Sequence, residues 1–178
     1  MKCSACRKGY LRPAKIDEGL PGYACTGCKG MLLSLSPYVD WMAPRRKQPR
    51  AEPQEPFDQS FTDTRHALGC PKCSRIMVKY KVLADAAHGL DYCFGCEEVW
   101  LDPGEWDWLK ARGMHLEITS VTTEAWQRKL RQQQQREAQS QRFRQMLGEE
   151  VHAEATRIRE WLAQQPARAE ILHYLGQD

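Results

Sequence analysis

Apolar and polar residues alternate along the middle of the chain. Ile76, Val78, Tyr80 and Val82 alternate with Met77, Lys79 and Lys81. A period of two is typical of a half-buried strand, so we predict a strand here. Positions 85–91 contain Ala-Ala-His-Gly and are predicted to form a hairpin tip. The return strands are then expected at Tyr92 and Phe94 and at Val99 and Leu101.

The next segment carries the signals of a short helix over 103–112. These signals are an N-cap residue, a proline suited to the first helical position, an acid in the capping-box position and a glycine stop: Asp102, Pro103, Glu105 and Gly113. Trp106 and Leu109 are three residues apart and share one side of this helix. We predict that Trp100 and Trp106 belong to the core. Trp108 falls on a different face and is a candidate for contact with a partner.

Residues 122–165 form a long polar segment that we predict to be helical. No proline occurs between Ala125 and Pro166, and Gly148 is the only glycine, so the helix is expected to break there. After Gly148 an apolar stripe follows spacings of four, three and four, and extends upstream: Val151, Ala155, Ile158 and Leu162, with Phe143 and Leu147. A last short helix over 167–175 is predicted to turn three residues inward: Ile171, Leu172 and Leu175.

Positive charge concentrates in the first part of that helical segment. Positions 128–144 hold six cations and one acid, and no apolar stripe persists from 132 to 141. A helix of this kind is marginal alone, so it is either a solvent-exposed spacer or lies against something acidic. Arg128, Lys129 and Arg131 are therefore candidate partner-binding residues. Oligomerisation through the C-terminal helices is a further possibility.

The eight cysteines form two matched sets of Cys-x-x-Cys pairs. In the first set 18 residues separate the two pairs, and in the second set 19 residues do. The second set follows the first at an offset of 67 residues for the leading pair and 68 for the trailing pair. The chain therefore contains an internal tandem repeat.

Four thiolates per set suit a closed tetrahedral zinc site, because short pairs at opposite ends of a hairpin can supply them without strain. We predict two Zn²⁺ ions held by Cys3, Cys6, Cys25 and Cys28 and by Cys70, Cys73, Cys93 and Cys96. A disulfide redox centre is the alternative, although redox motifs usually occur singly. A closed site leaves no open position for metal catalysis. With no Gly-rich phosphate loop or nucleophile elbow in the sequence, we predict that the protein is not an enzyme.

The second set lies in a longer motif that reads C-P-x-C, C-x-x-C and V-W-L-D-x-G-E. This motif resembles the transcription factor IIB-type zinc-ribbon family and covers about 40 of the 178 residues. The resemblance implies zinc ligation by the four cysteines, a strand ending at 100–102 and a helix starting at 104–105. The chain departs from the family in having Glu97-Glu98 where Gly-Gly is common, and Trp106 where leucine is usual. The first set lacks the marks of the trailing helix, so the sequence leaves open whether a helix follows it.

Charge and composition add little to this picture. Hydrophobic residues make up 42% and charged residues 28%, and the formal net charge is +3. Two zinc tetrathiolate centres would bring that charge to about −1, so overall basicity is no argument for a nucleic-acid partner. Arg45, Arg46 and Lys47 form a small basic cluster in a proline-rich linker. They could touch phosphates, or they could simply keep the linker in solution.

Targeting and membrane signals are missing from the sequence. No apolar run approaches the roughly 20 residues of a membrane span. The N-terminus lacks the apolar core of a signal peptide and begins a cysteine pair at once. We therefore expect a cytoplasmic protein without membrane insertion.

The predicted fold class is small α+β, with two tandem zinc ribbons (β-hairpin knuckles) followed by a long C-terminal α-helical region. The expected segments are a first ribbon at 1–43, a linker at 44–66, a second ribbon with a short helix at 67–113 and a helical region at 114–178. The predicted function is a non-catalytic zinc-binding interaction module. Its expected partner is a protein, with nucleic acid possible, in a transcription- or assembly-related role. The alternatives are a structural adaptor whose C-terminal helices insert into a larger complex, and a zinc-thiol redox-switch chaperone.

Overall fold

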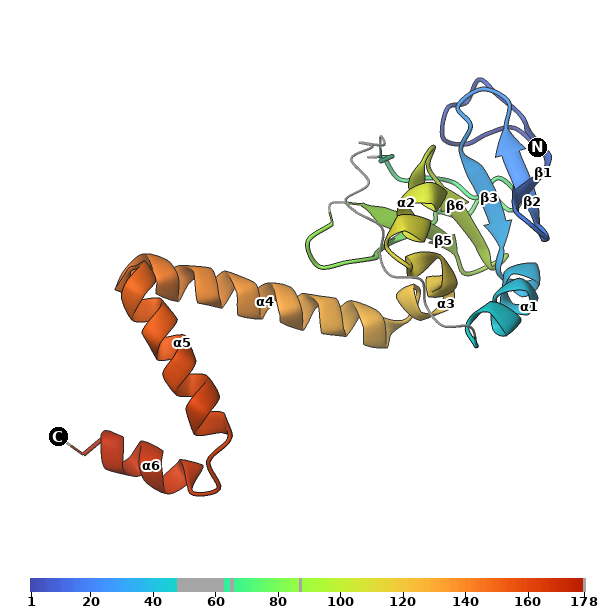
Figure 1. Cartoon of the computed structure of the whole chain (residues 1–178). Coiled ribbons are helices and arrows are strands. Elements are labelled where there is room, and N and C mark those ends of the chain that lie inside the picture. The colour runs from blue at the N-terminus through green and yellow to red at the C-terminus, as the bar shows by residue number, and fades with distance from the viewer. Residues whose placement is uncertain (48–62, 65, 87, 178) are drawn as a thin grey trace. The chain divides into compact units, whose positions relative to one another are not determined.

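The computed structural model describes residues 1–47, 63–64, 66–86 and 88–177. It is a small α+β structure with an antiparallel sheet and C-terminal helices (Figure 1). The six strands are β1 Leu11–Asp17, β2 Leu20–Cys25, β3 Met31–Ser34, β4 Val78–Lys81, β5 Gly89–Cys93 and β6 Glu98–Leu101. The chain divides into two compact units, Met1–Arg131 and Gln132–Asp178. Each unit is described by itself.

The two cysteine repeats share one sheet. The strand order is β1-β2-β3-β6-β5-β4, so the last strand of each repeat pairs with the last strand of the other. In this central pairing Leu32 lies opposite Trp100, and Leu33 lies opposite Val99. Leu32 and Trp100 are each the fourth residue after the last cysteine of their repeat. The pairing is therefore isologous, as at the interface of a twofold dimer.

Helices follow both central strands. The first repeat continues directly into α1 Leu35–Arg45, and the second continues into α2 Glu105–Ala111 (Figure 1). The short η1 Met114–Leu116 and α3 Ile118–Val121 come next. The sequence left open whether a helix follows the first repeat. Its formation is consistent with the position of Pro37 in the first turn, where the missing N–H is not needed.

Strand alternation divides the interior into two cores. Leu33, Val99 and Leu101 belong to a helix-side core, in which the sheet packs against the helices. That core contains Ile16, Leu20, Leu33, Tyr38, Trp41, Met42, Val82, Leu90, Tyr92, Val99, Leu101, Trp106, Trp108, Leu109, Ile118 and Val121. Leu32 and Trp100, next to them along the strands, belong to a separate cysteine-side core with Cys3, Leu11, Cys25, Leu68, Cys70, Met77 and Cys93. Adjacent residues thus serve opposite faces of the sheet.

Trp108 occupies a different environment from the predicted one. Only 4% of it is exposed, so it is a core residue and not a free contact surface. The His88 ring packs edge-on against the Trp108 ring, with 5.8 Å between the ring centroids. The Arg112 guanidinium carbon lies over the Trp108 ring, 4.4 Å from its centroid. Trp100 and Trp106 are buried, as predicted.

Two local features of the second repeat also differ from the sequence expectations. Ile76 and Val78 are exposed while Met77 is buried, because β4 lies at the edge of the sheet and the register turns Met77 inward.

The start of α2 is capped only in part. The Glu105 carboxylate accepts the Asp102 N–H at 3.0 Å, as in a capping box. The Asp102 carboxylate instead accepts hydrogen bonds from the Trp100 indole and from Thr64.

The remaining helices are α4 Glu124–Leu147, α5 Glu149–Ala163 and α6 Arg168–Leu175. The break between α4 and α5 falls at Gly148, as predicted, with a φ of 81° that favours glycine. The first turns of α4 pack on the first unit, since the Trp126 indole donates to the Val82 carbonyl at 3.1 Å. No described helix is long and apolar enough to cross a membrane.

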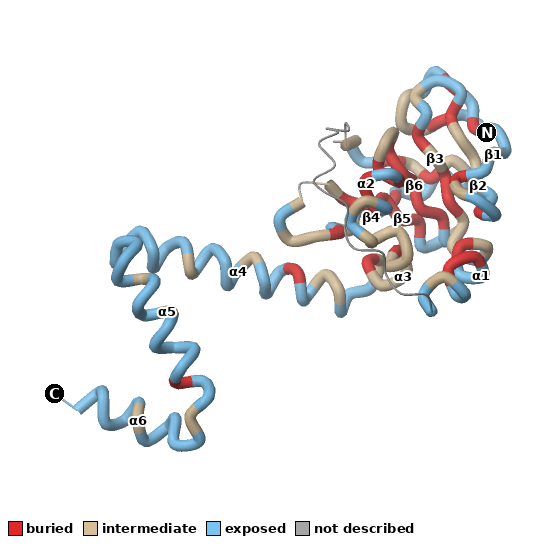
Figure 2. Tube along the Cα trace, viewed as in Figure 1, coloured by how far each residue is buried: buried red, intermediate tan, exposed pale blue. Residues whose placement is uncertain are grey.

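Most described residues of the second unit are exposed (Figure 2). Among its described residues Leu162 is the buried hydrophobic one. The exposed large ones are Phe143, Met146, Leu147, Val151, Ile158, Trp161, Leu172, Tyr174 and Leu175. The predicted inward orientation of Leu172 and Leu175 is therefore wrong, because the described residues supply no core for them to enter.

Candidate metal centres

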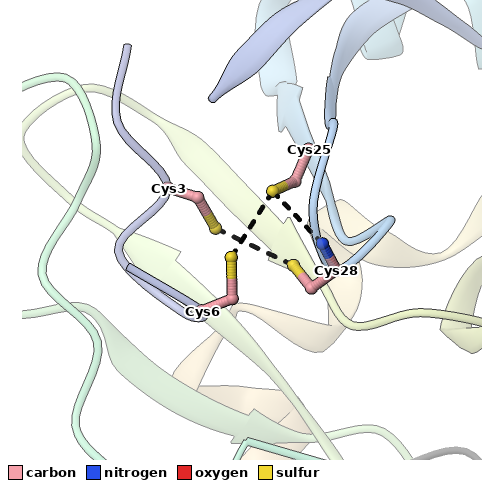
Figure 3. Close-up of side chains that lie close together, drawn as sticks. All are labelled: Cys3, Cys6, Cys25 and Cys28. Carbon is pink, nitrogen blue, oxygen red and sulfur yellow. Dashed lines mark hydrogen bonds between the residues drawn. The ribbon is translucent and has the colours of Figure 1, made fainter. Parts of the chain in front are cut away.

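Four cysteines of the first repeat converge at one end of its hairpin. Their sulfur atoms all lie within 4.8 Å of one another. The Sγ atoms of Cys3 and Cys28 are 3.8 Å apart, and those of Cys6 and Cys25 are 3.7 Å apart (Figure 3). The side chains point toward a common centre from two different knuckles.

The second repeat forms the same arrangement. The sulfur atoms of Cys70, Cys73, Cys93 and Cys96 also lie within 4.8 Å of one another, with 3.5 Å between Cys73 and Cys93. All eight cysteines are free. A tetrahedral ion with bonds of about 2.3 Å to sulfur holds its ligands about 3.8 Å apart, whereas a disulfide needs about 2.05 Å. The sulfur spacing thus fits two four-thiolate metal sites and not disulfides.

The backbone repeats one turn at every cysteine pair. In each pair the carbonyl of the first cysteine accepts the N–H of the residue after the second cysteine, at 2.8 to 3.2 Å. That residue has a left-handed φ in all four pairs: Arg7 57°, Lys29 67°, Ser74 62° and Glu97 55°. These four are the positive-φ residues other than glycine in the described chain. The turn aims both sulfurs of a pair at the same point.

Backbone amides also point at the sulfurs of the first centre. The Gly9 N–H donates to Cys6 Sγ at 3.3 Å, and the Gly27 N–H donates to Cys25 Sγ at 3.3 Å. A Cβ on Gly9 would lie only 2.6 Å from Cys25 Sγ. Glycine is therefore required where the two knuckles meet, and the amides stabilise thiolate charge.

Acidity differs among the thiols. Backbone N–H groups, chiefly that of Gly9, lower the pKa of Cys6 to about 6, and the Arg75 N–H lowers the pKa of Cys73 to about 7. Burial raises the pKa of three others: Cys3, Cys28 and Cys70. A buried thiol loses its proton readily only when a cation compensates the charge. A cluster that combines thiols of lowered pKa with buried thiols of raised pKa is suited to a bound divalent ion, which compensates the charge of the deprotonated sulfurs.

The two centres are joined by one small core. The cysteine-side core contains Cys3 and Cys25 of the first centre, Cys70 and Cys93 of the second, and the Leu32–Trp100 pair from the central strands. The Trp100 ring lies against Gly30, where a Cβ would approach it to 2.3 Å. The metal sites therefore lie around the apolar contact that holds the repeats together.

The predicted basic cluster is largely engaged within the protein. Arg45 donates to the Trp41 carbonyl at 2.7 Å, and its guanidinium lies 4.3 Å from the Trp41 ring. Arg46 forms an ion pair with Glu117. Lys47 is exposed. The structure thus ties two of these three cations to neighbouring elements of the first unit.

The predicted cations of α4 differ among themselves. Arg131 forms an ion pair with Glu124 on the same helix. Arg128 and Lys129 are exposed. Sequence reasoning missed a larger group of cations beside the first metal centre, although their proximity to Cys6 and Cys28 in the sequence was a usable signal.

Comparisons with known proteins add no relative: no protein-family model matches the chain, and neither a curated protein nor a solved structure matches it significantly.

Proposed function

We propose that the protein is a non-catalytic zinc-binding interaction module built from two zinc ribbons of the transcription factor IIB type. The observation that carries this proposal is the convergence of eight free thiols into two four-sulfur groups, in each of which all sulfurs lie within 4.8 Å of one another. Each group has four protein ligands, which leaves no coordination position for a substrate. The metal therefore stabilises the fold, and function lies on the surfaces that the ribbons present.

Zinc is the metal we infer from the ligand set. Tetrahedral four-thiolate sites suit Zn²⁺ or iron–sulfur chemistry. The sulfur separations of 3.5 to 3.8 Å match the tetrahedron around one zinc ion. Binding at such a site contributes on the order of 10 kcal/mol to folding, which offsets the small cores of each repeat.

Elemental analysis of protein purified without chelator tests the metal assignment. We expect two equivalents of zinc, and one equivalent for Cys25→Ser or Cys93→Ser. Chelation at neutral pH should abolish the near-ultraviolet dichroism of the buried tryptophans. Iron in place of zinc, or clearly less than two equivalents in protein that remains folded, would contradict the proposal.

A second candidate function is a structural adaptor, which the exposed apolar residues of the second unit favour. Ile158 and Trp161 of α5 are about half exposed, and Met146 of α4 is 77% exposed. Isolated helices of this kind gain most of their stability from packing, so a partner that covers them would stabilise them. The expected partner is a larger protein complex.

Pull-down with two versions of the chain separates the adaptor role from a role of the ribbons. One version is intact, and the other ends after Arg131, which retains Trp126 and its contact with Val82. Loss of protein partners from the short version supports the adaptor. Retention of every partner by the short version would remove the basis for it.

A further inference from the structure

The two cysteine clusters have the same backbone arrangement, but the residues around them differ in charge. The first is surrounded by cations, and the second by apolar and mixed-charge residues. We propose that the cationic surface of the first repeat binds single-stranded nucleic acid. This inference rests on the proposed function, because the first centre must be metal-bound for its knuckles to be formed.

The cationic surface consists of five residues of the first repeat: Lys2, Arg7, Lys8, Arg12 and Lys29. All five are exposed, and none forms an ion pair within the part of the chain that the structure describes. The first 33 residues contain two acids, Asp17 and Glu18, at the far end of the β1–β2 hairpin. Asp17 is already paired with Lys110 at 3.0 Å. A zinc tetrathiolate centre would carry a charge of about −2, which is smaller than the charge of these cations, so the surface is net positive.

These cations are grouped around the first centre by the fold. Arg7 and Lys8 follow Cys6 directly, and Lys29 follows Cys28. Lys2 is bridged to Tyr10 at the start of β1, which continues into Arg12. Both knuckles of the first centre and the adjacent edge strand thus carry exposed cations.

The second repeat shows that metal binding does not demand this charge. Its positions equivalent to Arg7 and Lys29, identified by the shared left-handed turn, are Ser74 and Glu97. Two of its lysines are bound to buried carboxylates, Lys72 to Glu98 and Lys79 to Asp91. A four-thiolate zinc centre carries the same charge in both repeats. The extra cations of the first repeat are therefore available for an external polyanion.

Tyr10 supplies the feature that distinguishes nucleic acid from other polyanions. Its side chain is 56% exposed, and its backbone is bridged to that of Lys2. Its backbone is fixed on both sides by Thr26, through hydrogen bonds of 3.1 and 3.0 Å. Tyr10 directly precedes β1, and strand alternation puts it and Arg12 on the same side, opposite the buried Leu11. A fixed exposed ring beside cations is the platform on which unpaired bases stack.

The shape of the repeat favours a single strand over its competitors. Residues 1–34 form strands and turns, so this surface offers no helix to enter the major groove of a duplex. β1 is an edge strand, but Pro13 removes a donor from its edge, which disfavours addition of a peptide strand. Peptides are therefore a poorer fit than an oligonucleotide.

The test measures zinc content and oligonucleotide binding on the same full-length sample. Fluorescence anisotropy with labelled 20-nucleotide oligo(dT) and oligo(U) is recorded across a salt series. We expect binding whose logarithm falls with the logarithm of salt, with a slope of about −2 to −4 for three to five phosphate contacts. Duplex DNA and poly-glutamate are the competitors, and both should compete poorly.

The variants copy the second repeat onto the first. Arg7→Ser with Lys29→Glu should keep two zinc equivalents, weaken binding more than tenfold at low salt and flatten the slope by at least one unit. Tyr10→Ile introduces the residue found at the equivalent bridge position of the second repeat, Ile76. It should weaken binding about tenfold with little change in the salt slope. Arg75→Ser with Lys81→Ser removes two cations from the second repeat, and Arg128→Ser with Lys129→Ser removes two from α4. Both control pairs should leave binding within about twofold.

The outcomes separate this inference from the proposed function. Two equivalents of zinc without oligonucleotide binding would overturn the inference and leave the metal assignment standing. Fewer than two equivalents would count against the metal assignment itself. Equal competition by duplex or by poly-glutamate, or an equal loss in the α4 variant, would also overturn the inference, since any of these would point to another partner class or another surface.

Discussion

Four residues with side chains adopt a backbone conformation that suits glycine. Arg7, Lys29, Ser74 and Glu97 each follow a cysteine pair with φ between 55° and 67°. A left-handed residue other than glycine costs roughly 1 to 2 kcal/mol. A glycine at such a position removes that cost. It also lowers the free energy of unfolding by roughly 0.5 to 1 kcal/mol, because it gives the unfolded chain more conformational entropy. A glycine at each position should therefore stabilise the metal-bound protein by about 0.5 to 1 kcal/mol.

Arg7→Gly is the sharpest case because its neighbour provides the control. Lys8 is also an exposed cation of the first knuckle, but its φ is not positive. Lys8→Gly should therefore destabilise by about 0.5 to 1 kcal/mol, while Arg7→Ala should show no gain because it keeps a Cβ. Urea unfolding of the zinc-loaded protein gives the free energies. Competition with a chelator gives an independent value, in which 0.7 kcal/mol is about threefold.

The test depends on the stability changes of Arg7→Gly and Lys8→Gly having opposite signs. If Arg7→Gly and Lys8→Gly shift stability in the same direction, loss of charge or general flexibility explains the result and the backbone argument is refuted. All four glycines together should give about 2 to 4 kcal/mol if the sites act independently. A much smaller sum would indicate that knuckles of one centre relax together.

Three further predictions concern the buried contacts. Gly30→Ala should destabilise by about 1 to 3 kcal/mol, because its Cβ would meet the Trp100 ring at 2.3 Å, whereas Gly69→Ala, with its nearest contact at 3.6 Å, should change urea stability little. Burial raises the pKa of Glu105 well above its usual value, so ionisation opposes folding as pH rises. As the pH rises from the unfolded-chain pKa of about 4.3 to the raised pKa of the folded state, wild-type stability should fall relative to Glu105→Gln by up to about 1.4 kcal/mol per pH unit, and a pH-independent difference in urea unfolding would contradict this. Cys25→Ser should hasten chelator removal of zinc from the intact second centre several-fold, since both centres share the cysteine-side core, and unchanged release kinetics would show that they are independent.

The sequence was sufficient to predict the two four-cysteine clusters because their pattern is local. Two cysteines separated by two residues must lie in one turn, and matched sets of such pairs predict two centres without knowledge of the rest of the fold. The sulfur geometry agrees with that prediction for all eight residues. The break at Gly148 was predictable for the same reason, since it follows from a single residue in an otherwise helical segment.

Contacts between distant segments were not predictable in this way. Trp108 seemed free because the helix periodicity places it away from Trp106, but His88 and Arg112 cover that second face. The register of β4 was ambiguous because Ile76, Met77 and Val78 are all apolar. It is fixed by bonds such as that from the Met77 N–H to the Leu68 carbonyl at 2.8 Å, which no periodicity reveals.

The central pairing explains why the two repeats benefit from being in one chain. Around a true twofold axis the residue on the axis meets its own copy, so identical ribbons would have to place two tryptophans or two leucines together. Here Leu32 meets Trp100, and Gly30 provides the space that the larger ring needs. A duplicated chain can fill that contact with unequal side chains at native packing density, whereas a dimer of identical ribbons cannot. The same freedom from symmetry allows the two repeats to differ in charge, with Arg7 and Lys29 in the first where Ser74 and Glu97 stand in the second.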